Sequence, residues 1–401
     1  MILGRNLTIK RALILTLAIF MLHNCSVVMP HIIKLKNLPE PSGKHFIGTQ
    51  IFTWIDESRP ELFTKEPLDY RKIVVQIWYP SVNEPGNPMP YVDYHKKRIY
   101  PLSEYLNVPQ FALSHVKKIQ TNSYLNAELD TKDGQYPLII FSHGLGGMRF
   151  QNTIQAEELA SNGYIVLAID HSYDANITIF SDGTKADFQS WKNPSHSIQE
   201  NLTERTKQLE IRSSDVRFVI TKINHISQHD IESIFYKSIN TDKIGIFGHS
   251  FGGSTSIYST WLDNRIDACL NLDGWFEPLP QKVIDEGIEK PILSIGMEKW
   301  KEFWTKNNQD KMNAFFNNSG HNDLEILIEG TMHSDFADYP HLTNFSERLG
   351  KKGTLESDKV LWSINKLTLG FFDMVLKGKD PKWLEEIKKQ KFIKFKNKKN
   401  N

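Results

Sequence analysis

The amino-acid sequence predicts an α/β protein with a mainly parallel central sheet, helices on its faces and insertions over one of its edges. Short apolar runs typical of buried strands alternate along most of the chain with longer segments of helical character. Two of the apolar runs pass directly into glycine-rich turns, at residues 142–147 and 248–253. The length of 401 residues is compatible with one large domain or with two.

The first two strands are expected at residues 46–54 and 72–78, and the apolar run 163–170 has the continuous hydrophobicity of a strand buried on both faces. Further strands are expected at 138–141, 243–247, 268–273, 291–296 and 325–330. Helices are expected at 155–162, 204–227, 254–261, 281–287, 300–316 and 362–376. The segments 94–129 and 172–197 interrupt this alternation, and we interpret them as insertions, the first of them over the active site.

The turn at 248–253 reads Gly-His-Ser-Phe-Gly-Gly, which places Ser250 at the centre of a Gly-x-Ser-x-Gly motif. An apolar strand precedes the turn and a helical segment follows it, and this is the setting in which the motif forms a nucleophile elbow. Glycines allow the tight turn because a Cβ would clash with the neighbouring elements. The context favours Ser250 as a catalytic nucleophile over a plain strand–helix turn.

A catalytic acid is expected after the nucleophile in the chain and before the base. The apolar run Ala268–Leu272 ends at Asp273, and the carboxyl ends of parallel strands are where α/β enzymes place their chemistry. Asp263 and Asp267 compete for the role, but they lie in a polar segment that reads as a surface connection. Asp273 is therefore the expected acid.

The chain has 14 histidines, so most of them are expected to have no catalytic role. His333 lies on a loop directly after the strand expected at 325–330, and it follows Asp273 in the required order. His321 precedes that strand and His341 lies on a more distant turn, whereas His249 is inside the elbow and is expected to point away from the nucleophile. His333 is the expected base.

The other glycine-rich turn follows the strand at 138–141 and reads His143-Gly-Leu-Gly-Gly147. In α/β-hydrolases such a turn supplies one backbone N–H to the oxyanion, and the residue after the nucleophile supplies the second. Here those residues would be Leu145 and Phe251. A phosphate-binding loop is the alternative, but the turn has neither the G-x-G-x-x-G spacing nor a Gly-Lys-Ser/Thr sequence.

These motifs together resemble the platelet-activating factor acetylhydrolase family of α/β-hydrolases over roughly residues 45–375. The segments that carry the resemblance are Phe141-Ser-His-Gly-Leu-Gly146, Gly248-His-Ser-Phe-Gly-Gly253, Leu272-Asp-Gly-Trp275, Met332-His-Ser-Asp-Phe-Ala-Asp338 and Val74-Val-Gln-Ile-Trp-Tyr-Pro80. The resemblance implies a serine esterase in which Ser250, His333 and Asp273 form the triad. It also implies hydrolysis of short or oxidised sn-2 acyl groups of phospholipids, without calcium and without a cofactor.

Two further functions are compatible with the same residues. One is a carboxylesterase of small non-lipid or polyester substrates with the same triad, and the other is a non-catalytic α/β-hydrolase that serves as a binding protein. Trp275 and Phe251 stand beside the acid and the nucleophile, where they would crowd a long acyl chain, and Trp275 is a candidate substrate-binding residue. Core packing is the alternative role for both aromatic side chains.

The N-terminal residues 1–25 have the pattern of an export signal. Arg5, Lys10 and Arg11 precede eleven mostly apolar residues, Ala12–Leu22, a length that suits a signal peptide and is short for a membrane span. Leu22-His-Asn-Cys25 resembles a loose lipoprotein cleavage site with Cys25 as the lipidated residue. The protein is therefore expected to be secreted or membrane-anchored, with a linker at 26–44.

The hydrolase domain is expected to span 45–380 and to be followed by a basic C-terminal tail at 381–401. Residues 388–401 carry seven lysines and no acidic residue, which indicates a solvated tail or a weak contact with anionic lipid. The formal net charge of +1 argues against a nucleic-acid partner. No Cys-x-x-Cys or His-Glu-x-x-His pattern indicates a metal site, and Cys269 is expected to be a buried apolar residue.

Overall fold

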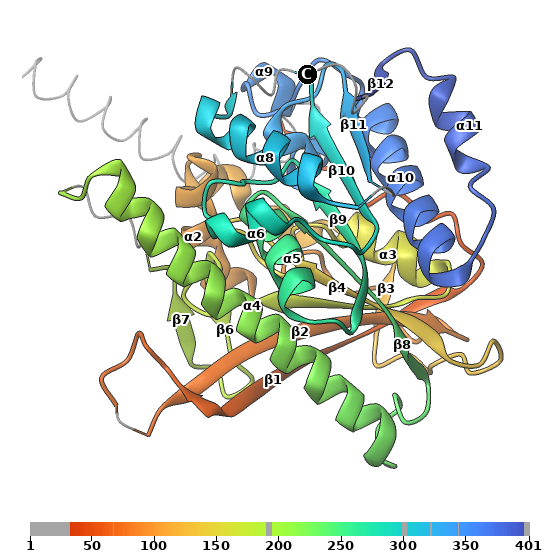
Figure 1. Ribbon diagram of the computed structural model, residues 1–401. Coiled ribbons are helices and arrows are strands. Elements are labelled where there is room, and N and C mark those ends of the chain that lie inside the picture. The colour runs from red at the N-terminus through yellow and green to blue at the C-terminus, as the bar shows by residue number, and fades with distance from the viewer. Residues whose placement is uncertain are drawn as a thin grey trace, which may run out of the picture.

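The computed structural model describes residues 33–66, 68–189, 195–298, 303–320, 323–343 and 345–396. A ten-stranded sheet in the order β12-β11-β10-β9-β8-β4-β5-β2-β1-β3 forms its centre (Figure 1). Its strands are β1 (Phe46–Pro60), β2 (Tyr70–Ser81), β3 (Ser123–Leu125), β4 (Tyr136–Ser142), β5 (Ile165–Asp170), β8 (Ile239–His249), β9 (Ile266–Leu272), β10 (Ile292–Met297), β11 (Leu324–Ile328) and β12 (Ile393–Phe395).

From β11 to β5 in this order, each strand is parallel to the next one. β1, β2 and β12 pair antiparallel at the two sides of this parallel block. The structure thus confirms the mainly parallel sheet. Because the carboxyl ends of parallel strands meet at one edge, the turns after β4, β8, β9 and β11 lie along the same edge.

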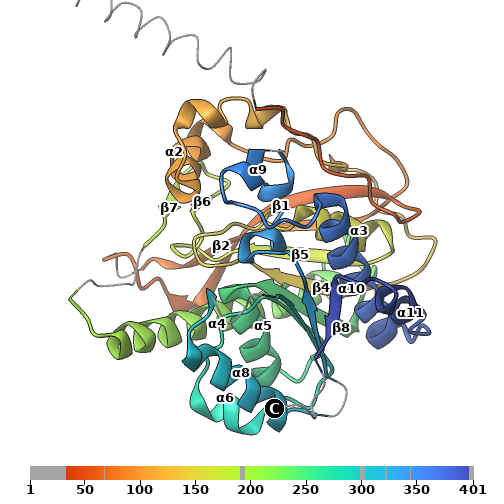
Figure 2. The ribbon, with the colours of Figure 1, turned by 90° about the horizontal axis from the view of Figure 1, so that it is seen from above.

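Helices cover both faces of the sheet, as Figure 2 shows for α5, α6 and α8 on one side and α3 and α10 on the other. The longest element is α4, which begins at a capping box formed by Ser197 and Glu200. The helices are α3 (Thr153–Ser161), α4 (Ile198–His229), α5 (Phe251–Leu262), α6 (Gln281–Glu286), α8 (Lys306–Asn318), α9 (Phe345–Arg348), α10 (Ser357–Lys377) and α11 (Trp383–Lys388).

The strands β4, β5, β9 and β10 of the parallel block are almost completely buried, which agrees with their near-continuous apolar sequences. One large cluster of apolar side chains joins β4, β5, β8, β9 and β10 to the helices on both faces. Cys269 is a free, buried cysteine in β9, as its apolar surroundings in the sequence predicted.

Both predicted insertions contain short regular elements. The first holds α2 (His95–Leu106), the 3₁₀ turns η1 (Gln110–Leu113) and η2 (Val116–Lys118), and strand β3. The second contains a small hairpin of β6 (Ile177–Ile179) and β7 (Lys185–Asp187). The two insertions contact one another, because Arg98 of α2 donates a hydrogen bond of 2.7 Å to the carbonyl of Ile177.

The prediction of a basic tail from residue 381 is wrong for its described part. Trp383 and Ile387 of α11 are buried, and β12 pairs with β11 as the last strand of the sheet. The many lysines indicated a solvated tail, because the apolar residues that pack on the domain lie between the charged ones. Residues 33–44 also pack on the domain, since Leu38 is buried and Leu35 forms a β-bridge with Thr343.

The predicted signal segment 1–25, including Cys25, lies outside the described residues. Among the helices of the described part, none combines the length and hydrophobicity that a membrane span requires.

Candidate active site

Ser250 lies in a sharp turn between β8 and α5. Its φ of 58° and ψ of −118° are strained for a residue with a side chain, and the strain is held because the Ser250 amide donates to the carbonyl of Leu272 at 2.9 Å. Gly252 is required here, since a Cβ at this position would overlap the carbonyl oxygen of Ser142 at the end of β4. The elbow predicted from the sequence is therefore present, and it leaves Ser250 partly exposed.

Asp273 and His333 are brought together from the ends of β9 and β11. Asp273 Oδ2 lies 2.5 Å from His333 Nδ1, and the carboxylate is fully buried while the imidazole retains 20% of its exposure. Asp273 has a positive φ of 45°, and its amide donates to the carbonyl of Ile295 at 2.7 Å. Since the carboxylate accepts the Nδ1 hydrogen, Nε2 of His333 is the nitrogen left to act as a base.

The His333 ring is held between aromatic side chains. Phe303 stacks on it at 4.7 Å, Trp304 meets it edge-on at 5.2 Å, and the ring of His249 lies 4.5 Å away. His249 accepts a hydrogen bond from Gln151 on Nδ1 and donates from Nε2 to the carbonyl of His333 at 3.0 Å. Burial and then the neighbouring His333 hold the pKa of His249 well below its usual value, so it supports the base loop as a neutral ring.

This arrangement differs from the sequence expectation in two respects. His249 packs against the expected base His333, a contact that the sequence did not predict. Phe303 and Trp304 were assigned to a helix without any role, although two adjacent aromatic residues upstream of the base were a visible signal. Ser250 and His333 form no hydrogen bond with one another in the described structure, and such contacts often tighten only when substrate binds.

Most polar groups of the turn Gly144–Gly147 have partners. The amides of Gly144, Gly146 and Gly147 donate to Gln151 Oε1, the carbonyl of Asp174 and the carbonyl of Gly144, at 3.2, 3.0 and 3.0 Å. Leu145 is different, because its amide has no acceptor among the described residues. Phe251 is the first residue of α5, where an amide has no partner within the helix.

Of the residues that competed for these roles, His341 is buried, and Asp263 and Asp267 lie away from Ser250, Asp273 and His333. His341 is buried and contacts the carbonyl of Asp335 at 2.8 Å, and burial lowers its pKa to about 4. Asp263 pairs with Arg265 at 2.6 Å, and Asp267 pairs with Lys290 at 3.2 Å, both near the amino end of β9. His321 is outside the described residues.

The two aromatic residues next to the site have different environments. Trp275 is half-buried, its amide donates to the carbonyl of Ser250 at 3.1 Å, and its indole N–H donates to Glu277 at 2.8 Å. Phe251 is fully buried, so the expectation that its ring would crowd a long acyl chain is wrong. The ring packs inward because α5 turns its first residue toward the helix α4.

A groove of about 740 Å³ lies directly beside the turn that carries Leu145. Its walls come from α2 and the β6–β7 hairpin, and they include Tyr100, Tyr105, Phe188, Lys97 and Lys185. A smaller and almost wholly apolar cavity of about 150 Å³ lies behind the same turn, where α2 packs on Met148 and Phe150. Within the described ranges, no group of three or more His, Cys, Asp or Glu side chains is arranged to hold a metal ion.

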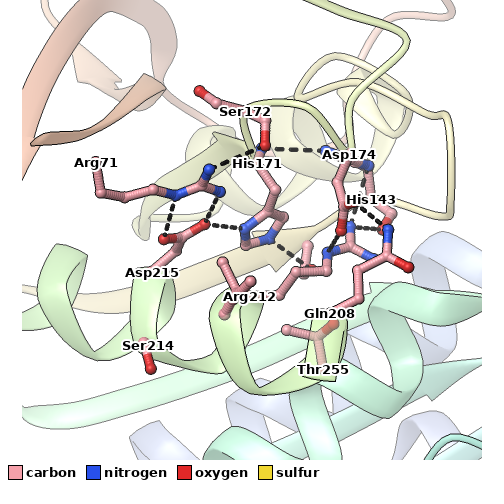
Figure 3. Close-up of polar contacts among 12 residues, drawn as sticks. Arg71, His143, His171, Ser172, Asp174, Gln208, Arg212, Ser214, Asp215 and Thr255 are labelled. Atoms are coloured by element: carbon pink, nitrogen blue, oxygen red, sulfur yellow. Dashed lines mark hydrogen bonds and ion pairs between the residues drawn. The ribbon is translucent and has the colours of Figure 1, made fainter. Parts of the chain in front are cut away.

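A second Ser–His–Asp array lies beneath the turn. Ser142 Oγ is 3.0 Å from His171 Nε2, and His171 Nδ1 is 2.9 Å from Asp215 Oδ2. All three side chains are fully buried, and Figure 3 shows the Arg71 guanidinium facing the Asp215 carboxylate next to the His171 ring. Burial lowers the pKa of His171 to about 3, so this ring is neutral at neutral pH and its role is structural.

The mainly parallel sheet, the strained serine between β8 and α5, and the acid and histidine after later strands define an α/β-hydrolase. A ferulic acid esterase from Streptomyces cinnamoneus has the same fold, with a TM-score of 0.73 and 23% identity over 90% of this chain and 99% of its own.

Residues 32–391 match the model of the family described as platelet-activating factor acetylhydrolase, isoform II. The platelet-activating factor acetylhydrolase of Canis lupus familiaris is 28% identical over 87% of this chain and 82% of its own length. A probable 1-alkyl-2-acetylglycerophosphocholine esterase of Arthroderma benhamiae is 24% identical over 86% and 89%. The chain belongs to the platelet-activating factor acetylhydrolase family and is an ester hydrolase.

Proposed function

We propose that this enzyme hydrolyses short, acetyl-type sn-2 esters of phospholipids through a calcium-independent acyl-enzyme mechanism. The observation that carries the proposal is the 2.5 Å contact between Asp273 and His333 at the same sheet edge as the strained Ser250. The family membership supports the substrate class, since relatives over most of the chain are named for the acetylated ether phospholipid.

In this proposal Ser250 Oγ attacks the ester carbonyl carbon while His333 Nε2 takes the hydroxyl proton. Asp273 holds the imidazole in the required tautomer and stabilises it when it becomes charged. The amides of Leu145 and Phe251 receive the oxyanion, and each such donor is typically worth about a hundred- to a thousandfold in rate. His333 then gives its proton to the leaving alcohol, and the ester C–O bond breaks.

Water completes the reaction by attacking the acyl group on Ser250 with His333 again as base. The short-chain carboxylic acid leaves, and Ser250 recovers its proton. Two backbone amides supply the oxyanion stabilisation that calcium gives in metal-dependent lipases, so we expect no loss of activity with a chelator. A short-acyl preference rests on the family and on Trp275, whose partly exposed ring lies next to the elbow.

A panel of acetyl, butyryl and palmitoyl esters on one glycerophospholipid backbone tests this proposal. We expect acetyl to be cleaved fastest, at the same rate with and without chelator. Faster cleavage of palmitoyl, or activity abolished by chelator, would contradict it.

The second candidate is a carboxylesterase of non-lipid esters. The groove beside Leu145 favours it, because Tyr100, Tyr105 and Phe188 offer aromatic walls on which a flat or bulky ester could stack. Aryl esters of simple alcohols in the same panel separate the two candidates. A higher kcat/KM for these than for the acetylated phospholipid would support the second one.

We further propose that the enzyme is exported and that it is secreted or held at a membrane surface through a lipid on Cys25. The charged and apolar pattern of residues 1–22 supports export. Mass spectrometry of the mature N-terminus decides between the forms. A diacylglyceryl group on Cys25 supports anchoring, cleavage without lipid supports secretion, and an intact Met1 in the cytoplasmic fraction contradicts both.

A further inference from the structure

Arg212 is a fully buried cation on α4 that touches both segments of the expected oxyanion hole. Its guanidinium donates to the carbonyl oxygen of His143, two residues before Leu145. The same guanidinium lies 4.9 Å from the centre of the Phe251 ring. Figure 3 shows Arg212 reaching from α4 to His143. One side chain thus joins the two turns that lie on either side of the reacting carbonyl.

The groups around Arg212 leave its guanidinium in contact with this turn. His143 accepts the amide hydrogen of His171 on Nε2 at 3.3 Å, and its Nδ1 lies 2.6 Å from the carbonyl of Gly144 and 3.1 Å from Arg212 Nη2. Burial and then Arg212 hold the pKa of His143 well below its usual value, and the ring is neutral. Asp215 is occupied by Arg71 at 2.7 Å, which leaves Asp174 as the carboxylate nearest to Arg212.

Asp174 also links Arg212 to the turn. Its carboxylate lies 3.7 Å from Arg212 Nε, while its backbone carbonyl accepts the amide of Gly146 at 3.0 Å. The carbonyl of Gly147 accepts the amide of Asn176 at 2.8 Å. The turn is therefore held on both sides of Leu145 in the sequence. Arg212 contacts it at His143, and the loop after β5 contacts it at Gly146 and Gly147.

Arg212 is not arranged for the best possible pairing. Its Nε and Nη1 atoms are buried and make no hydrogen bond with the described residues. Leaving donors of a buried cation unpaired costs stability, and such costs tend to be retained where they serve function. Burial lowers the pKa of Arg212 to about 10, which still leaves it charged at neutral pH.

We propose that Arg212 is a positioning residue for the oxyanion hole, which sets the orientation of the Leu145 and Phe251 amides from beneath. It acts through the His143 carbonyl and the Phe251 ring and does not touch substrate. This inference rests on the proposed function, because it needs those two amides to be the oxyanion donors. A displacement of about 1 Å in such a site can cost on the order of a hundredfold in rate.

The variant Arg212→Lys tests the proposal, because lysine keeps the charge and loses the planar guanidinium fork. With p-nitrophenyl acetate as substrate, we expect kcat to fall about tenfold to a hundredfold while KM stays within about twofold. Phenylboronic acid, which forms a tetrahedral anion on the nucleophile, should bind more weakly by the same factor as kcat falls. A purely structural arginine would change the melting temperature without this matched loss.

Arg98→Lys is the matched control. Arg98 is also fully buried and ion-paired, to Asp93 at 2.6 Å, but it contacts neither Leu145 nor Phe251. We expect a lower melting temperature and unchanged boronate affinity. Equal losses of boronate affinity in the two variants would overturn the proposal, and so would normal kcat and boronate affinity in folded Arg212→Lys.

If Arg212→Lys does not fold, Phe251→Leu decides, because it keeps the backbone amide and removes the ring that rests on Arg212. A severalfold loss of kcat and of boronate affinity at constant KM supports the proposal, and no loss overturns it. Failure of the proposed acyl-enzyme mechanism at Ser250 gives a different result, since the wild-type enzyme would then neither cleave p-nitrophenyl acetate nor bind the boronic acid.

Discussion

The described part of the molecule contains two Ser–His–Asp arrays that share residue types and a His–Asp contact but have opposite surroundings. In one, His333 lies 2.5 Å from Asp273 and Ser250 stands in a strained turn between β8 and α5. In the other, His171 lies 2.9 Å from Asp215 and 3.0 Å from Ser142, the last residue of the extended strand β4. In the second array the serine is hydrogen-bonded to the histidine, yet all three side chains are fully buried.

The comparison teaches that the two arrays differ in access and backbone geometry, while their residue types are the same. Ser250 projects from a turn and His333 is partly exposed, so substrate can reach both. Ser142, His171 and Asp215 have no exposed surface. Their hydrogen bonds fix the strand end from which the turn 143–147 departs, and the buried array thereby supports the accessible one.

The largest expected effect separates the two serines. Ser250→Ala should lower hydrolysis by about a millionfold, as loss of the nucleophile does in other triads. Ser142→Ala should leave activity within about tenfold, because it removes only a buried hydrogen bond. A fluorophosphonate probe followed by mass spectrometry checks this, and labelling of Ser142 or near-normal turnover in Ser250→Ala would contradict it.

The next effect separates the base and the acid from their neighbours. Asp273→Asn should lower kcat by about ten-thousandfold with the fold intact, since the amide favours the wrong tautomer of His333. His333→Ala should be similarly impaired, and neither loss should add to that of Ser250→Ala because the three groups act as one unit. His341→Ala and His321→Ala are the controls, and a larger loss in either would move the base.

Asp215→Asn should instead act on stability. Asp215 holds Arg71 at 2.7 Å and His171 at 2.9 Å, both buried, and the partly exposed Arg59 at 2.8 Å. Burial opposes its ionisation, but the adjacent Arg71 outweighs this and lowers the pKa far below its ordinary value. Breaking such a buried pair costs about 3–5 kcal/mol. Denaturant unfolding of the variant measures it, and a change below about 1 kcal/mol would argue against the cluster as a support.

The last expected effect is a pH dependence of unfolding. The folded-state pKa of His171 is about 3, below its unfolded value, so the unfolded chain binds more protons between pH 3 and 6.5. The free energy of unfolding should therefore fall as pH falls through this window, by about 1.4 kcal/mol per unit for this residue. His171→Asn should reduce the slope by that amount, whereas an unchanged slope would show that His171 is not buried as a neutral ring.

Much of this molecule could be predicted from local patterns. Each strand of the parallel block contains an apolar run, and the sequence around Ser250 has the pattern of a strand, a glycine-rich turn and a helix. Asp273 and His333 were found because both directly follow such runs in the expected order. The sequence could not predict the contacts of His249 and Arg212, since they join elements that are distant in the chain. It also misplaced the C-terminal segment, whose lysines obscured the docking of Trp383 and β12.

By itself, the sequence determined the fold class and the candidates for the reacting residues, because hydrophobic periodicity and glycine turns act over a few residues. Only the tertiary structure showed that Ser142, His171 and Asp215 form a second, buried array, since burial depends on which segments cover a side chain. It alone brought Arg212 of α4 under the turn at Leu145. Such contacts join residues far apart in the chain, and no local pattern encodes them.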